Sequence, residues 1–139
     1  MRLQFKVDGN DFLRAGEASA TVKRNLKQLG IAASIVRKVA IAMYEAEMNM
    51  AIHGDGGEID VIITEKMVDI TLKDRGPGIP DISLAMKEGY STASQYIREL
   101  GFGAGMGLPN IKKYSDELKI TSIIGEGTTV HIKIFLSGG

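Results

Sequence analysis

Three polar side chains recur at helical spacing within and directly after a largely apolar segment, residues 35–52. Glu45, Asn49 and His53 stand four residues apart in succession, so a helix with 3.6 residues per turn projects them from nearly one face. The carbonyl oxygen of an asparagine suits Mg²⁺, which takes one or two protein oxygens and completes its shell from phosphates and water. A glutamate one turn earlier can accept a proton from an attacking hydroxyl or water. The spacing is therefore typical of a magnesium-nucleotide site.

The alternative is that this stripe is the solvated side of an amphipathic helix, which is the better explanation if the stripe is taken alone. His53 is interpreted as a helix-end residue that makes a structural hydrogen bond. Lys38 and Glu47 lie off the stripe and are interpreted as surface residues.

The segment DRGPGI, residues 74–79, directly follows a predicted strand. Its glycines Gly76 and Gly78 permit positive φ and a close approach of the backbone to a flat ligand. A carboxylate fixed at the strand end, Asp74, can accept a hydrogen bond from the exocyclic amino group of adenine, whereas guanine presents a second acceptor there. Taken alone, the same segment is better explained as an ordinary Pro-Gly turn.

The segment GFGAGMGL, residues 101–108, places glycine at every second position and then enters a predicted helix. Backbone N–H groups of such a loop, with a helix N-terminus behind them, can bind phosphate. The spacing does not fit a dinucleotide fingerprint, and the chain contains no Gly-Lys pair from which to build a P-loop. A flexible linker is the alternative, but the apolar residues between the glycines disfavour it.

A third glycine segment, GEGTT at residues 125–129, lies between two predicted strands. Taken alone it is interpreted as a hairpin turn.

Hydrophobic periodicity predicts the helices that position these residues. Residues 11–29 carry apolar positions at helical spacing, with Gly30 as the C-cap. A second helix is predicted between its N-cap, Ser34, and Gly54. A third short helix is predicted after the second glycine loop.

Alternating apolar residues predict five strands: residues 2–8, 58–64, 67–73, 117–124 and 128–136. The second and third strands are joined by a short connection, and so are the fourth and fifth. Each of these two pairs is expected to form an antiparallel hairpin. We therefore expect an α+β fold, a two-layer sandwich in which helices cover one face of a mainly antiparallel sheet.

Composition excludes several classes of function. The 17 basic and 17 acidic side chains give zero formal net charge, which disfavours nucleic-acid binding. The absence of cysteine and the presence of only two histidines exclude disulfides, thiol nucleophiles and histidine-rich metal centres. No apolar run is long enough to span a membrane, and no signal-peptide core is present. We expect a cytoplasmic protein without a membrane partner.

In chain order, these motifs resemble those of the Bergerat-fold (GHKL) ATPases and kinases over about residues 35–135. Glu45-x-x-x-Asn49 resembles the N box of this family, and Asp74-x-Gly76-x-Gly78-Ile79 resembles its first glycine box. The second glycine box is matched by Gly103-x-Gly105-Met106-Gly107-Leu108, and the last box by Gly127-Thr128. The resemblance implies one ATP-binding domain over residues 1–139, with an ATP lid over about residues 80–107.

The resemblance also implies roles for the matched residues. Asn49 would hold Mg²⁺ on the triphosphate, and Glu45 would orient or deprotonate a substrate hydroxyl. Asp74 would recognise adenine, with Thr128 supporting that contact. The loop glycines of the lid would close over the phosphates.

The length of the chain and the run PGIPDISLAMKEGYST resemble the stand-alone serine kinases of bacterial anti-sigma regulation, the switch kinases among them. The segment TASQYIRELGF departs from their lid in being longer and more apolar. The resemblance implies an ATP-dependent serine/threonine kinase whose substrate is a STAS-domain antagonist.

Two alternatives stay open: a nucleotide-gated binding module that captures a sigma factor or phosphatase regulator, and a detached histidine-kinase domain. Apolar residues of the first helix would form a homodimer interface or pack on the sheet.

Overall fold

The computed structural model describes residues 1–9, 14–53, 56–76 and 107–136. Its strands form one sheet in the order β1-β2-β3-β5-β4, and each neighbouring pair is antiparallel. The strands are β1 (Arg2–Asp8), β2 (Gly56–Ile63), β3 (Met67–Asp74), β4 (Glu117–Ile123) and β5 (Gly127–Phe135). Each coincides closely with a strand predicted from alternation, and both predicted hairpins are confirmed.

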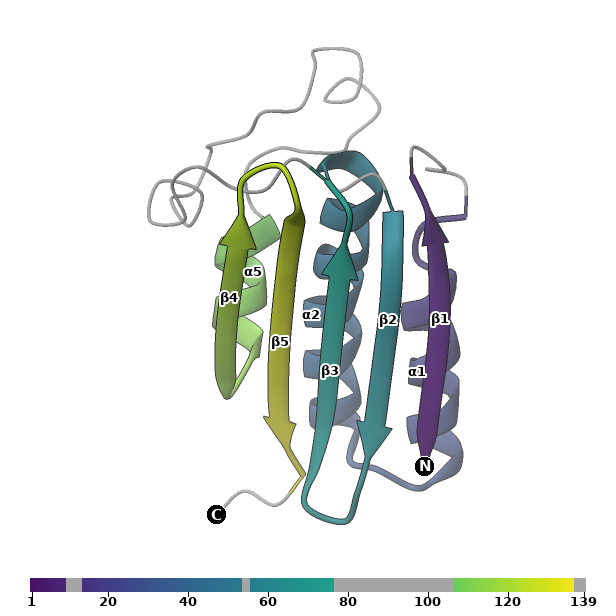
Figure 1. The fold of residues 1–139 in the computed structure, drawn as a ribbon. Helices are drawn as coiled ribbons and strands as arrows, with labels where there is room; N and C mark the ends of the chain where they lie inside the picture. Colours follow the sequence, from purple (N-terminus) through teal and green to yellow (C-terminus); the bar gives the residue numbers. More distant parts are fainter. Residues whose placement is uncertain (10–13, 54–55, 77–106, 137–139) are drawn as a thin grey trace.

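Three helices lie together on one face of this sheet (Figure 1): α1 (Glu17–Gln28), α2 (Ala33–His53) and α5 (Gly107–Tyr114). Helix α2 runs behind the middle of the sheet, α1 behind its β1 side and α5 behind its β4 side. The predicted two-layer α+β sandwich is confirmed. None of the helices in the described part of the chain is long and apolar enough to cross a membrane.

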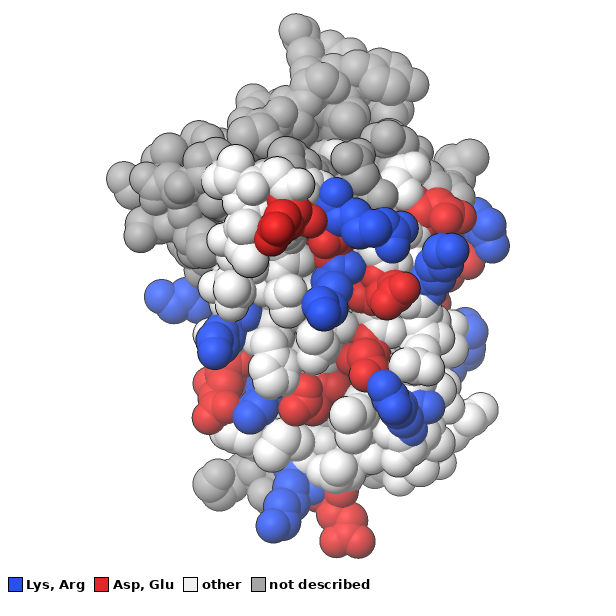
Figure 2. Space-filling model, viewed as in Figure 1, with Lys and Arg blue, Asp and Glu red and all other residues white. Residues whose placement is uncertain are grey.

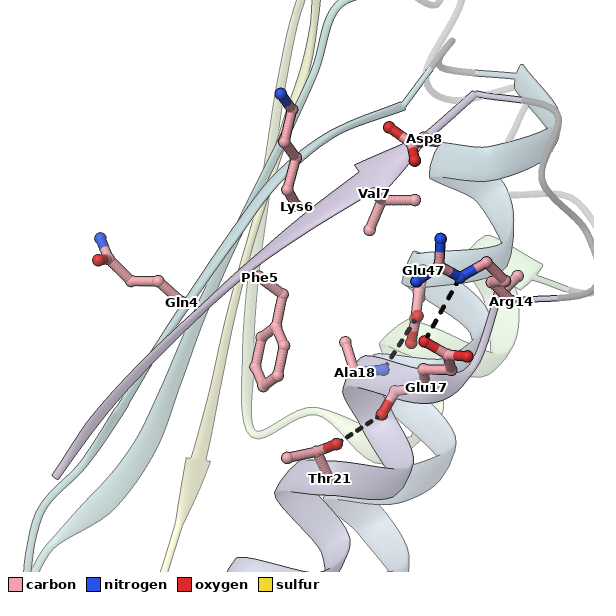
Figure 3. A pocket seen from close by; sticks show the side chains of 11 residues that line it. Gln4, Phe5, Lys6, Val7, Asp8, Arg14, Glu17, Ala18, Thr21 and Glu47 are labelled. Atoms are coloured by element: carbon pink, nitrogen blue, oxygen red, sulfur yellow. Dashed lines mark hydrogen bonds and ion pairs between the residues drawn. The ribbon is translucent and has the colours of Figure 1, made fainter.

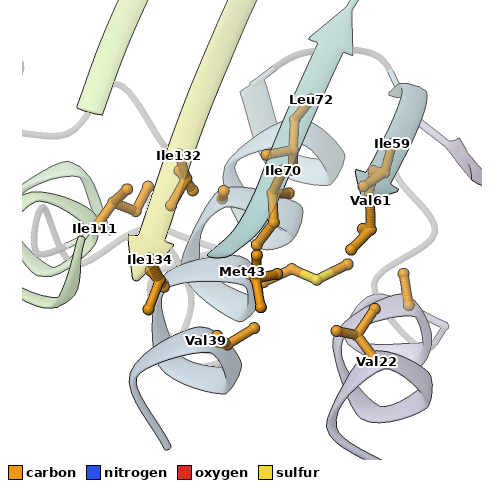
Figure 4. Close-up of a cluster of buried hydrophobic side chains, with 14 of the residues drawn as sticks. Val22, Val39, Met43, Ile59, Val61, Ile70, Leu72, Ile111, Ile132 and Ile134 are labelled. Atoms are coloured by element: carbon orange, nitrogen blue, oxygen red, sulfur yellow. The ribbon is translucent and has the colours of Figure 1, made fainter. Parts of the chain in front are cut away.

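The core lies between the two layers (Figure 4). Its fully buried members come from all three helices and the central strands: Val22, Leu26, Val39, Met43, Ile59, Val61, Val68, Ile70, Ile111, Ile132 and Ile134. Burial of each such side chain contributes roughly 1.5–3 kcal/mol to folding. Val22 and Leu26, two apolar residues of α1, pack inside the chain.

The opposite face of the sheet is covered by interspersed acidic and basic side chains (Figure 2). Arg2 and Asp60 form a two-point ion pair across β1 and β2, with distances of 3.0 and 2.9 Å. His131 lies 2.7 Å from Asp69 across β3 and β5. Exposed pairs of this kind contribute little to stability, so the helix-covered face provides most of the fold's free energy.

The first two helices differ from prediction at their N-termini. Residues 14–16 form a turn, and α1 begins only at Glu17. Helix α2 begins at Ala33, so Ser34 lies within its first turn and is not the N-cap. The predicted end of α1 is confirmed, because the N–H groups of Gly30 and Ile31 donate to the carbonyls of Lys27 and Leu26 in a Schellman motif.

Candidate active site

Helix α2 presents the polar stripe near its C-terminal end. Ala46, Met48 and Met50 beside the stripe are buried, whereas Glu45 and Asn49 are half-buried. The stripe is therefore accessible to water or a ligand, as is the exposed Tyr44 beside it. His53 ends the helix, and its side chain lies outside the described residues.

The environment of Glu45 adjusts its acidity in two opposite ways. Burial against α5 disfavours the charged form and raises the pKa of this carboxyl above its ordinary value. A hydrogen bond from the side chain of Asn110 lowers the pKa and offsets part of that effect. The net result is a carboxylate that accepts a proton more readily than an exposed glutamate does.

Asn110 was not predicted as a site residue. It lies in the first turn of α5, three residues after Gly107, so packing of α5 on α2 brings it to Glu45. Only its place directly behind the glycine loop could have indicated it.

Asp74 ends β3 and is fixed by backbone donors. One carboxylate oxygen, Oδ1, accepts hydrogen bonds from the N–H of Gly76 at 3.0 Å and from the N–H of Thr128 at 2.9 Å. Thr128 is 6% exposed, and its hydroxyl lies 2.9 Å from that of Ser122. The structure therefore brings together three of the predicted site residues, Asp74, Gly76 and Thr128.

Strand register explains this meeting of residues 54 positions apart. Lys73 of β3 pairs with Thr129 of β5, so Asp74 and Thr128 become neighbours. Gly127 permits the approach: its φ is 137°, and a Cβ there would lie 2.2 Å from the carbonyl oxygen of Asp74. A side chain at this position would push the two strand ends apart.

The polar stripe of α2 and the Asp74–Thr128 cluster lie at the same end of the molecule. The C-terminal half of α2, the end of β3, the start of β5 and the first turn of α5 all meet there (Figure 1). Of the second glycine box, Gly107 begins α5 and Leu108 is half-buried against the core. The other predicted loop residues, Gly78, Ile79, Gly103, Gly105 and Met106, lie outside the described residues, as does the predicted lid before Gly107.

Glu47 corrects the sequence interpretation, since it is not a surface residue. Its side chain is 2% exposed and faces the N-terminus of α1, away from the stripe. Its hydrogen-bond donors belong to residues that precede it by 28 to 31 positions in the chain. No local sequence pattern reveals contacts over such a separation. Lys38 does lie at the surface, 3.3 Å from Asp116.

A cavity of about 350 Å³ lies beside Glu47, between β1 and the first turn of α1 (Figure 3). Phe5 and Val7 of β1 line it, with Arg14 and Glu17 on the α1 side. This cavity is separate from the cluster formed by Glu45, Asp74 and their neighbours.

Comparison with known proteins identifies the arrangement. A family model described as histidine kinase-, DNA gyrase B- and HSP90-like ATPase matches residues 36–138. The chain belongs to this ATPase family. The resemblance inferred from the motifs is confirmed, and use of a nucleotide follows from membership.

Curated relatives narrow the family. The chain is 32% identical over 118 residues to the serine/threonine-protein kinase RsbT of Bacillus subtilis, covering 81% of this chain and 83% of the relative. It is 30% identical over 139 residues to the anti-sigma F factor of Geobacillus stearothermophilus, covering 96% and 90%. Within this ATPase family, the chain is therefore related to bacterial serine/threonine kinases and anti-sigma factors.

Solved structures agree on the fold. The RsbU and RsbW domains of a Mycobacterium tuberculosis protein match with a TM-score of 0.68 at 18% identity, covering all of this chain and 33% of that one. A mycobacterial sensor histidine kinase, MprB, matches with a TM-score of 0.55 at 17% identity, covering 97% of each chain.

Proposed function

We propose that this protein is an ATP-dependent serine/threonine kinase of a bacterial partner-switching system, and that it phosphorylates a STAS-domain regulator. The observation that carries the proposal is the placement of a half-buried carboxylate, Glu45, at the end of the molecule that also holds the Asp74–Thr128 cluster. The kinase relative RsbT, similar over most of both chains, supports the same activity.

The Asp74 cluster is the adenine end of the proposed site. Two backbone N–H groups hold Oδ1 of this carboxylate at 2.9–3.0 Å, so its orientation is set before a ligand arrives. A fixed acceptor selects adenine over guanine, because guanine would bring a carbonyl oxygen against it. Thr128 supports the carboxylate through its backbone N–H.

Asn49 is the proposed ligand for Mg²⁺. Its side chain is half-buried and stands one helical turn beyond Glu45, at the end where α5 begins. A neutral amide oxygen fits the ion, since Mg²⁺ takes few protein ligands in nucleotide sites. When bound, the ion would neutralise charge on the β- and γ-phosphates.

Glu45 is the proposed base. The serine or threonine hydroxyl of the substrate attacks the γ-phosphorus while the bond from that phosphorus to the bridging oxygen of ADP breaks. Glu45 takes the hydroxyl proton, and the products are ADP and a phosphorylated side chain. The raised pKa of Glu45 strengthens it as a proton acceptor.

A second function, nucleotide-gated capture of a sigma factor, is favoured by the names of several relatives, which are anti-sigma F factors. Kinase activity and sigma capture would use the same nucleotide site, so nucleotide binding by itself does not distinguish the two functions. Sigma capture alone requires nucleotide binding without phosphoryl transfer.

The test is transfer of γ-labelled phosphate from Mg-ATP to the purified STAS-domain proteins of the host. Label on one STAS protein, lost in Glu45→Ala, supports the kinase. Lys38→Ala, a surface substitution on the same helix, is the matched control and retains transfer. If ATP binds but no STAS protein is labelled, the kinase proposal fails, and binding of host sigma factors with ATP against ADP tests the alternative.

A further inference from the structure

Helix α1 begins without a cap of its own. The residue before its first turn is Gly16, with φ at 101°, and no side chain of the helix itself caps the N-terminus. The first N–H groups of any helix lack partners within it. In most helices a Ser, Thr, Asp or Asn at the N-cap accepts from them, and glycine cannot.

Glu47 of α2 supplies the missing cap from outside the helix. Its Oε2 accepts from the N–H of Gly16 at 2.9 Å and of Ala18 at 3.2 Å. Its Oε1 accepts from the N–H of Ser19 at 3.0 Å and from the Ser19 hydroxyl at 2.7 Å. Both oxygens of this buried carboxylate are therefore committed to the start of α1. Figure 3 shows the bond to Ala18.

Electrostatics reinforce these hydrogen bonds. The N-terminus of a helix carries partial positive charge, which a carboxylate stabilises. Charge-assisted hydrogen bonds are stronger than neutral ones. Together, the bonds on this one side chain join the first turn of α1 to α2.

The turn of α2 that Glu47 occupies is the turn that bears the proposed site. Glu45 and Asn49 lie two residues before and after it, on the other side of the helix, since two residues correspond to about 200°. The first turn of α1 also lies close to this turn, because a Cβ on Gly16 would lie only 3.1 Å from the ring of Tyr44. On the far side, Asn110 of α5 bonds Glu45.

We propose that Glu47 is a positioning residue: by capping α1 from α2, it fixes the orientation of the α2 turn that carries Glu45 and Asn49. This inference rests on the proposed function of those two residues. Phosphoryl transfer depends mainly on placement of the reacting groups, and a misplacement of about 1 Å can cost two orders of magnitude in rate. Loss of the cap therefore slows transfer in protein that is still folded.

The test compares Glu47→Gln with Val22→Ala. The amide that Glu47→Gln introduces can accept at one atom only, and its NH₂ group presents a donor to the N–H groups of α1. Val22→Ala opens a cavity in the same helix, at a residue with no exposed surface, and leaves every bond of Glu47 in place. Both variants lower Tm, so Val22→Ala controls for lost stability.

Transfer from γ-labelled ATP to the STAS protein labelled by the wild type is measured below both Tm values. Glu47→Gln is expected to lower kcat about tenfold and to raise Kd for Mg-ATP by a smaller factor, because Asn49 lies on the same turn. Val22→Ala is expected to keep kcat. Equal kcat for Glu47→Gln and wild type overturns the proposal and leaves Glu47 a purely structural cap.

A second variant and a second readout keep the inference separable from the kinase proposal. Ser19→Ala removes the hydroxyl bond to Glu47 and is expected to shift kcat in the same direction by a smaller factor. NMR resonances of the Glu45 carboxyl and the Asn49 amide, recorded without nucleotide, are expected to move in Glu47→Gln but not in Val22→Ala. If the wild type labels no STAS protein, the kinase proposal fails alone, and unmoved resonances in Glu47→Gln then overturn the positioning role.

Discussion

Helix α2 carries two carboxylates, two residues apart, that lie in opposite surroundings. On the side facing α1, Glu47 is 2% exposed and both of its oxygens accept hydrogen bonds from the first turn of that helix. On the side facing α5, Glu45 is half-buried and is bonded by the side chain of Asn110. The same residue type thus appears once with four hydrogen bonds to its oxygens and once, within the part of the chain that the structure describes, with one side-chain donor.

The difference separates structure from chemistry. A carboxylate whose lone pairs are all taken cannot accept a proton from a substrate without breaking those bonds. A carboxylate with few donors and a raised pKa can. Saturation, more than burial, therefore distinguishes the proposed base, Glu45, from the buried cap, Glu47.

The largest effect on stability is expected from Glu47→Ala. The substitution leaves buried N–H groups of α1 without an acceptor, and the free energy of unfolding should fall by about 3 kcal/mol. Urea unfolding followed by circular dichroism measures the change. A loss below about 1 kcal/mol would mean that water replaces the carboxylate, and the contrast between the two sides of α2 would weaken.

A second effect concerns the acidity of Glu45. Asn110→Ala removes the hydrogen bond that lowers the pKa of this carboxyl, so burial alone remains and the pKa rises further. The base must be ionised to act, and the acid limb of the pH–rate profile should move to higher pH. An unmoved limb would show that Glu45 does not control the rate.

Glu45→Gln tests the cost of holding this carboxylate. Because the pKa of Glu45 is raised in the folded state, its contribution to stability is fully present below the unfolded pKa and is lost as pH rises through the folded pKa. Glu45→Gln has no carboxyl group at this position, so its stability does not fall in this way as pH rises. Its Tm relative to wild type should therefore rise as pH increases from below the unfolded pKa through the folded pKa, as measured by thermal unfolding.

The opposite trend would be a Tm of Glu45→Gln that falls relative to wild type as pH rises from acidic to neutral. That result would place Glu45 among the structural carboxylates with Glu47.

The smallest effect is expected at the open face of the sheet. Asp60 has a two-point partner in Arg2 at 2.9–3.0 Å, yet both lie in solvent. Arg2→Ala should shift Tm by about 2 °C or less. A shift as large as that of Glu47→Ala would show that good geometry alone, without burial, makes a carboxylate structural.

Much of this arrangement could be predicted from the sequence, because it depends on local patterns. Alternation located the strands, and helical spacing placed Glu45 and Asn49 on one side of α2. Asp74 and Thr128 were predicted from glycine motifs, and strand register brought them to 2.9 Å.

What could not be predicted depends on contacts between distant elements. The late start of α1 follows from Gly16 and from a cap supplied by Glu47, which is 31 residues further on. Spacing alone placed Glu47 off the polar stripe and hence, wrongly, at the surface. The bond from Asn110 to Glu45 likewise requires α5 to pack on α2, which no periodicity within either helix specifies.

The central claim is that Glu45 is the base of a phosphoryl transfer. The most direct measurement is a single-turnover assay in which Glu45→Gln and wild type, each loaded with γ-labelled Mg-ATP, are mixed with the STAS protein that the wild type labels. Transfer by the variant should be slower by about 10²-fold or more, with Kd for Mg-ATP within about twofold. Equal transfer rates would contradict the claim and require another group to accept the proton.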